Sequence, residues 1–185
     1  MKPAKEPEAP EANNEKSELL KCYFELQLES QQTIWLDTVG QSMLTLFWRG
    51  DKARIQTKIN KFQIGQVVIF YRDDKMFAHR IVDFLPESDR WITKGDTQYY
   101  FDTPVRESEF IGVIDCIKKG KRQFPVATDI EMANLSAAIG HKLDQQFSWL
   151  PNWLQYLCYF IYFIPSYYRL KQKRKKDQSN AYQNH

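Results

Sequence analysis

The middle of the chain is a succession of short runs rich in β-branched and aromatic residues, with turn residues between them. The most continuous runs cover 66–71, directly after Gly65, and 110–117. Runs of this length and composition, bounded by Gly, Pro and Asp, are typical of β-strands. Their close spacing favours antiparallel pairing over a parallel α/β fold. The sequence therefore predicts a mainly β protein with a coiled, barrel-like antiparallel sheet.

Further strands are expected on both sides of these runs. Apolar and polar residues alternate in 22–29, and similar patterns predict strands at 33–39, 54–59, 76–85 and 90–93. Gly120 supplies a turn that allows 118–124 to form a hairpin and its returning strand.

Beyond Pro125 the pattern changes to that of helices. Apolar residues recur at helical spacing from Ile130, which predicts a helix within 126–148. Residues 149–168 form a densely aromatic segment, and 169–185 form a basic tail. At the other end, residues 1–17 are rich in Pro, Glu and Asn, so they are expected to be a disordered arm. The length allows one domain with a substantial core, at 18–125, and peripheral segments.

Charge and cysteine placement exclude several classes of function. Residues 169–177 carry a net charge of +5, so the rest of the chain carries −2 of the total +3. A basic tail on a slightly acidic body is not a basic groove, and no nucleic-acid binding is expected. The three cysteines, at 22, 116 and 158, have no paired spacing. We therefore expect no metal site, no cofactor and no disulfide framework.

Two residues in the β region indicate chemistry. Ser42 follows Gly40 in a turn-like stretch, and His79 lies inside a predicted strand. A serine hydroxyl is a weak nucleophile unless a base takes its proton, and a histidine with a carboxylate behind it is the commonest such base. Asp96 and Asp102 follow in the chain as candidate carboxylates. A lone serine or aspartate beside glycine is more often a turn residue, so only their joint occurrence carries the argument.

The order of short motifs around these residues resembles that of the type I signal peptidase and LexA-like serine peptidase group. His79 followed by Arg80 is similar to the archaeal and endoplasmic-reticulum branch, in which histidine replaces the bacterial general-base lysine. The likeness covers about residues 33–117. Its blocks are Gly40–Met43, Arg49–Asp51, Ile64–Phe70, His79–Val82, Thr93–Asp96, Asp102 and Ile111–Val113.

The resemblance implies a serine endopeptidase that cleaves a leader or signal peptide, with 18–125 as its catalytic domain. Ser42 is then the nucleophile and His79 the general base. The resemblance implies an assisting aspartate, for which Asp102 is favoured and Asp96 is the alternative. Backbone N–H groups around Ser42 and Met43 are expected to bind the oxyanion. Gly40 is expected to let the substrate backbone approach closely, and an extended peptide added to a sheet edge is the expected partner.

The chain departs from the group's pattern at two positions. Thr45 stands where the group usually has proline, and Gln66 stands where it usually has aspartate before the Val-Val run. These departures favour an alternative hypothesis, a catalytically inactive peptide-binding or membrane-associated module on the same fold.

The C-terminal region predicts contact with a membrane surface. About 20 apolar residues are needed to span a bilayer, and 149–168 is interrupted by Pro151. Its Trp and Tyr residues suit the membrane interface, and the basic residues up to Lys176 suit anionic headgroups. We therefore expect a membrane surface to bind Trp149 to Lys176. The alternatives are a helix packed on the protein's own core and an integral membrane segment. Because no apolar run follows Met1, the catalytic domain is expected on the cytoplasmic side.

Overall fold

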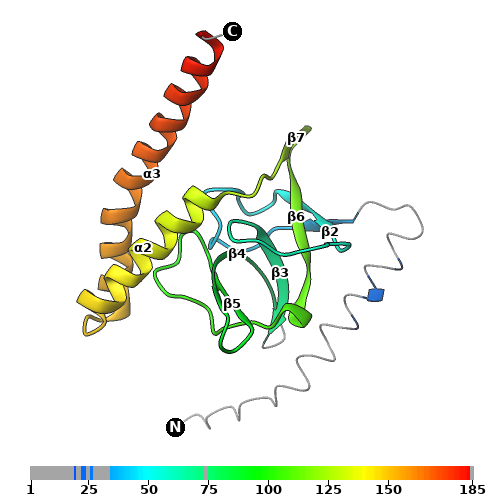
Figure 1. Cartoon of the computed structure of the whole chain (residues 1–185), viewed down its shortest axis with the longest axis horizontal. Coiled ribbons are helices and arrows are strands. Elements are labelled where there is room, and N and C mark those ends of the chain that lie inside the picture. Colours follow the sequence, from blue (N-terminus) through cyan, green and yellow to red (C-terminus); the bar gives the residue numbers. More distant parts are fainter. Residues whose placement is uncertain (1–18, 20–21, 24–25, 27–33, 73–74, 184–185) are drawn as a thin grey trace.

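The computed structural model of the chain describes residues 19, 22–23, 26, 34–72 and 75–183 (Figure 1). Within these ranges, seven strands form one antiparallel sheet, and two helices follow it. The strands are β1 (Trp35–Asp37), β2 (Lys52–Gln56), β3 (Val67–Arg72), β4 (Lys75–Leu85), β5 (Arg90–Lys94), β6 (Phe110–Lys119) and β7 (Arg122–Pro125). A short 3-10 helix, Glu107–Glu109, precedes β6, and the helices are α2 (Ile130–Phe147) and α3 (Asn152–Gln183).

The sheet is open, with the order β1-β2-β6-β3-β4-β5 and with β7 paired to β6. The prediction of a mainly antiparallel β protein followed by helices is confirmed, but the barrel-like form is not, because the sheet is not closed. Closure requires the two terminal strands to pair, but β1 pairs only with β2 and β5 only with β4 among the described strands. The predicted hairpin is confirmed, because β6 and β7 pair antiparallel around Gly120, whose φ is +58°.

Two central strands are buried on both faces, which explains their continuous apolar runs. In β3, Val67 and Ile69 belong to one apolar cluster, whereas Val68 and Phe70 belong to another. The same division holds along β6. The sheet therefore has core on both sides in its centre, and His79 lies opposite Val68 on the adjacent strand β4.

The predicted helix within 126–148 is α2, which begins at Ile130 because the Asp129 side chain accepts a hydrogen bond from the Met132 N–H at 2.9 Å. The second helix extends further than expected. It contains Pro165 and continues through the basic tail to Gln183. In Figure 1, α2 and α3 lie together at one side of the sheet, and the C-terminal half of α3 projects beyond it.

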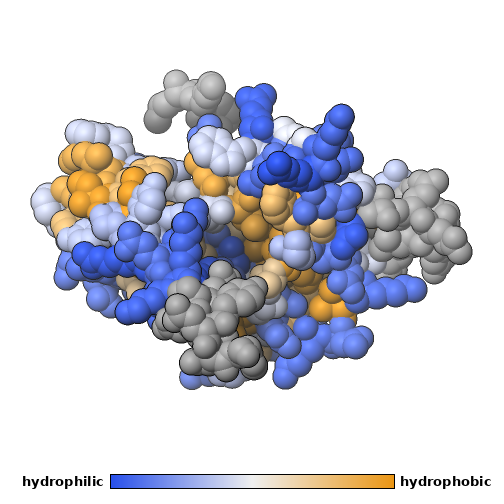
Figure 2. Space-filling model, turned by 90° about the horizontal axis from the view of Figure 1, so that it is seen from above, coloured by the Kyte–Doolittle hydropathy of each residue, from blue (hydrophilic) through white to orange (hydrophobic). Residues whose placement is uncertain are grey.

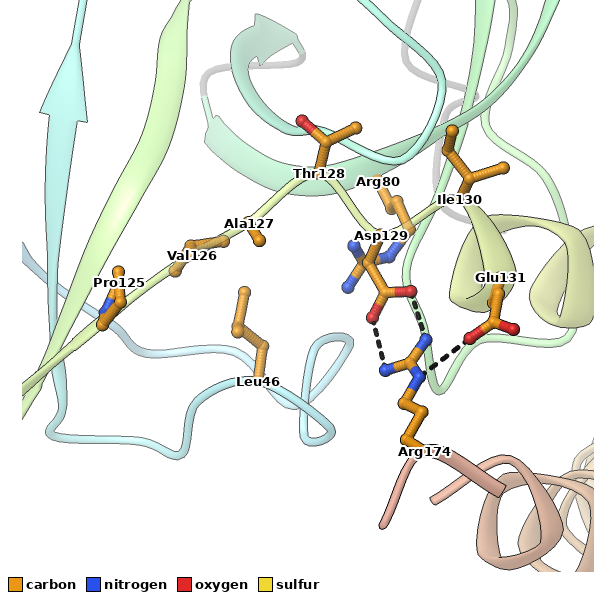
Figure 3. Close-up of a pocket in the computed structure, with 10 residues that line it drawn as sticks. All are labelled: Leu46, Arg80, Pro125, Val126, Ala127, Thr128, Asp129, Ile130, Glu131 and Arg174. Atoms are coloured by element: carbon orange, nitrogen blue, oxygen red, sulfur yellow. Dashed lines mark hydrogen bonds and ion pairs between the residues drawn. The ribbon is translucent and has the colours of Figure 1, made fainter. Parts of the chain in front are cut away.

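The basic part of α3 is fixed to the start of α2 by ion pairs (Figure 3). The Arg174 guanidinium donates to both carboxylate oxygens of Asp129, at 3.0 and 2.5 Å, and to Glu131 at 3.0 Å. Lys173 also pairs with Glu131, at 3.0 Å. Burial opposes ionisation of Asp129, but its hydrogen bonds with Arg174 hold the pKa of that carboxyl below its ordinary value.

Two other predictions concern the ends of the chain. A strand was expected at 22–29, but the described residues there, 22, 23 and 26, are helical; the remainder of that stretch and the 1–17 arm lie outside the described residues. The C-terminal aromatic segment left open an integral membrane span. In the described part of the chain, no helix is both long enough and apolar enough to cross a bilayer.

Candidate active site

Ser42, His79 and Asp102 come together from three different parts of the fold. Ser42 lies in the turn between β1 and β2, His79 lies on β4, and Asp102 follows β5. The His79 Nε2 atom is 3.0 Å from Ser42 Oγ, and its Nδ1 atom is 2.6 Å from Asp102 Oδ2. His79 is only 2% exposed, so β4 and its neighbours fix the ring between the two partners.

The contacts determine which ring nitrogen carries the proton. An ionised carboxylate only accepts hydrogen bonds, so His79 Nδ1–H donates to Asp102. The Nε2 atom of the neutral ring then has a free lone pair and accepts the Ser42 hydroxyl. Thr93 Oγ1 also donates to Asp102 Oδ2, at 2.8 Å, and the Asp102 N–H donates to the Thr93 carbonyl at 2.9 Å. The carboxylate is therefore held by strand β5 as well as by the histidine.

The loop that follows β5 supports the turn containing Ser42. Thr97 N–H donates to the Ser42 carbonyl at 2.8 Å, and Thr97 Oγ1 donates to the Gln41 carbonyl at 2.5 Å. Gly95 lies so close that a Cβ placed there would be 2.6 Å from Ser42 Cβ. A side chain at position 95 would therefore displace the serine.

Asp96, the alternative partner for His79, has a different environment. Its carboxylate is fully buried and forms a bidentate pair with Arg80, at 2.8 and 2.7 Å. Burial alone would lower the pKa of the Arg80 guanidinium, but the adjacent Asp96 charge raises it above its ordinary value. Of the two candidate carboxylates, Asp102 contacts the histidine and Asp96 pairs with the arginine next to it.

The two positions that depart from the signal-peptidase pattern both form hydrogen bonds. Thr45 Oγ1 donates to Asp96 Oδ2, which joins the serine turn to the buried ion pair. Gln66 Oε1 accepts from the Gln63 N–H at 2.8 Å. Thr45 therefore contributes a contact with the site's supporting loop, whereas Gln66 forms a local contact before β3.

The two residues considered for oxyanion and substrate binding lie on either side of Ser42. Met43 is fully buried, and its sulfur accepts a hydrogen bond from the Asp96 N–H at 3.3 Å. Its side chain is thus part of the core, and only its backbone is available for an oxyanion. Gly40 is exposed at the edge of a cleft, where an added Cβ would be 3.9 Å from Ser42 Oγ.

A cleft of about 710 Å³ runs past the serine and histidine. Its lining is mostly apolar and comes from β1, the β1–β2 turn, β2, β3, β4, β6 and α3. The described residues around it include Leu36, Val39, Gly40, Ser42, Phe47, Ala53, Ile69, Met76, Phe77, Ala78, His79, Ile114 and Tyr156. A wide apolar cleft that ends at a hydroxyl–imidazole pair suits an extended chain with apolar side chains.

Lys94 is a buried residue of this region that sequence reasoning did not single out. Its ammonium donates to the Gln98 carbonyl at 2.5 Å, to Ser136 Oγ on α2 at 2.9 Å and to Tyr159 OH on α3 at 3.3 Å. The Tyr159 hydroxyl in turn donates to the Asp96 carbonyl. Burial lowers the pKa of Lys94 to about 7. The lysine, which lies in the Thr93–Asp96 block, thus connects the serine-supporting loop to both helices.

Comparison of the chain with protein-family models, curated proteins and solved structures found no match.

Proposed function

We propose that this chain is a serine endopeptidase of the signal-peptidase type, which cleaves a leader or signal peptide. The observation that carries the proposal is the continuous hydrogen-bonded series from Ser42 through His79 to Asp102, at 3.0 and 2.6 Å. Each member has the position that nucleophilic acyl transfer requires: a hydroxyl at the cleft, a base touching it, and a carboxylate that fixes the base's tautomer.

In the proposed reaction, Ser42 Oγ attacks the scissile carbonyl carbon while His79 Nε2 takes the hydroxyl proton. The imidazolium that forms is stabilised by Asp102. Collapse of the tetrahedral intermediate breaks the C–N bond, and Nε2–H protonates the leaving amine. Water then attacks the acyl carbon and gives a proton to Nε2. Collapse of this second intermediate breaks the bond between the acyl carbon and Ser42 Oγ, Nε2–H returns its proton to Oγ, and the carboxylate product leaves. Backbone N–H groups of the turn at Ser42 and Met43 are the proposed oxyanion donors.

An extended peptide is the proposed substrate. Strand β5 pairs with β4 only from Arg80 to Leu85, so within the described residues the preceding part of β4 has a strand partner on one side only. That part, Lys75–His79, lines the cleft. A peptide could add to the free edge through backbone hydrogen bonds and direct alternate side chains into the cleft. Small Ala53 and Ala78 leave room there.

The test uses an alkyl fluorophosphonate, which labels activated serines, together with comparison of peptides that accumulate in cells. We expect the probe to label the wild type and neither Ser42→Ala nor His79→Ala. Uncut precursor should accumulate with both variants, and it would identify the substrate and the bond. Matched controls are Ser88→Ala and His141→Ala, which change exposed residues elsewhere.

Two results would count against the proposal. Retained cleavage in Ser42→Ala would remove the serine from the mechanism. A wild type that is folded but unlabelled, and that binds peptides without cutting them, would instead support the inactive peptide-binding module.

A further inference from the structure

The outer face of α3 carries an apolar stripe that the domain does not cover. Residues at 153, 157, 161, 164 and 168 follow one another at three- or four-residue steps, so they share one side of the helix. Trp153 is 68% exposed and Ile161 is 60% exposed. The other three are Leu157, Ile164 and Tyr168, all exposed. Because a soluble helix normally turns its apolar side inward, this stripe indicates a binding surface.

The opposite face of α3 already packs on the protein. Tyr159 and Phe163 are buried in a cluster with Leu143 of α2. The aromatic content of α3 therefore exceeds what the core uses. Figure 2 shows apolar side chains gathered at the left of the molecule, the same side on which Figure 1 places α2 and α3. The alternative of a helix packed on the protein's own core therefore describes the inner face of α3 and leaves its outer face exposed.

Beyond Tyr168, the side of α3 that carries the apolar stripe becomes positively charged. The next positions at the same helical spacing are Lys171 and Lys175, both exposed and neither in an ion pair with another described residue. By contrast, Lys173 and Arg174 point to α2, where they pair with Asp129 and Glu131. The outer face is thus apolar and aromatic for about 22 Å and cationic where it ends.

We propose that this face of α3 binds the surface of an anionic membrane, with the helix lying in the interface plane. Aromatic and aliphatic side chains would enter the boundary between headgroups and acyl chains, and the two lysines would contact acidic headgroups. A purely apolar protein partner would not require the aligned lysines, and this charge complementarity favours lipid. Tyr156 on the same helix lines the cleft, so binding would also bring the cleft near the lipid surface. That consequence rests on the proposed function, whereas membrane binding does not.

Sedimentation of the full chain with phosphatidylcholine vesicles, with and without phosphatidylserine, tests the proposal. We expect binding to vesicles that contain phosphatidylserine, weakened by salt. Lys171→Gln with Lys175→Gln should reduce the partition coefficient about fivefold per charge removed. The matched control is Lys58→Gln with Lys121→Gln, which removes two exposed charges elsewhere and should change little.

A second variant tests the apolar part of the face. Trp153→Gln with Ile161→Gln should abolish sedimentation with vesicles, whereas Trp48→Gln, at a side chain 62% exposed in the β1–β2 connection, should not. Circular dichroism shows whether each variant remains folded. The proposal fails if the wild type does not bind phosphatidylserine vesicles or if the stripe variant binds equally well. It also fails if the stripe is a dimer interface instead. In that case the wild type would be a dimer that does not bind vesicles, and the variant with Trp153→Gln and Ile161→Gln would be a monomer.

Discussion

Replacement of Lys94 by methionine should change how the stability of the protein depends on pH. The ammonium is buried, and its pKa is lowered from an ordinary value of 10.5 to about 7 by burial, partly offset by the charges of Asp96 and Asp102. Between these two values, the unfolded chain binds a proton that the folded chain does not. The free energy of unfolding of the wild type should therefore rise with pH through this window.

The magnitude follows from the two pKa values. The whole shift corresponds to about 5 kcal/mol, present as a cost to the folded state below the lower pKa and absent above the upper one. Between about pH 7 and pH 9, roughly 2 kcal/mol of this cost should disappear. Methionine has a similar shape and no charge, so its variant lacks this term. Hydrogen bonds lost with the ammonium shift the variant at every pH and cancel from the comparison.

Urea unfolding of wild type and Lys94→Met at both pH values measures this difference. The stability of the wild type relative to the variant should increase by about 2 kcal/mol from pH 7 to pH 9. Lys121→Met is the control, because that side chain is exposed and its variant should differ from the wild type equally at both pH values. An equal difference for Lys94→Met at both pH values would show that the lysine keeps its proton in the folded state, and the reasoning would be refuted.

Three further predictions concern the segment from Gly95 to Asp102, which follows β5. Asp102→Asn should leave the urea midpoint near that of the wild type but lower kcat by about 10,000-fold, because the amide no longer fixes the tautomer of His79. A large drop in the urea midpoint that accounts for the lost activity would contradict this. Asp96→Asn should instead cost about 3–5 kcal/mol of stability, since it leaves buried Arg80 without its charge partner, and unchanged unfolding would contradict the assignment. Gly95→Ala should reduce cleavage about 100-fold by moving the Ser42 turn, measured with a peptide from the accumulated precursor, and near-normal cleavage would show that the turn adapts.

Local sequence patterns were sufficient to predict the strands that are buried on both faces. The runs at 66–71 and 110–117 became β3 and β6, because strands buried on both faces leave a continuous apolar record in the sequence. The alternation at 22–29 was a weaker guide, and the described residues there are helical. The same region also has Leu19, Cys22, Tyr23 and Leu26 at three- and four-residue steps, which is the spacing of one helix face, and periodicity alone does not distinguish the two.

The candidate site was predictable to the extent that residues were recognisable within ordered motifs. Ser42, His79 and Asp102 were named from the sequence, and the structure brings them into contact. Which of Asp96 and Asp102 contacts His79 depends on the direction of each side chain, and the spacing of residues along the sequence does not determine that direction. The surroundings of Lys94 were beyond sequence reasoning, because its partners Ser136 and Tyr159 come from helices that follow far along the chain.

These long-range contacts change which residues should be counted in the proposed catalytic domain. The sequence favoured a peptidase domain ending at 125, with the helices as attachments. Yet α2 and α3 supply Ser136 and Tyr159, which bind Lys94 and the carbonyl of Asp96, and the same loop places Thr97 against Ser42. Without the helices, the Lys94 ammonium would lose two of its partners, and the Asp96 carbonyl would lose its hydroxyl donor, in the loop that supports Ser42. The helices therefore belong to the structural support of the proposed active site, and α3 joins that support to its outward-facing apolar stripe.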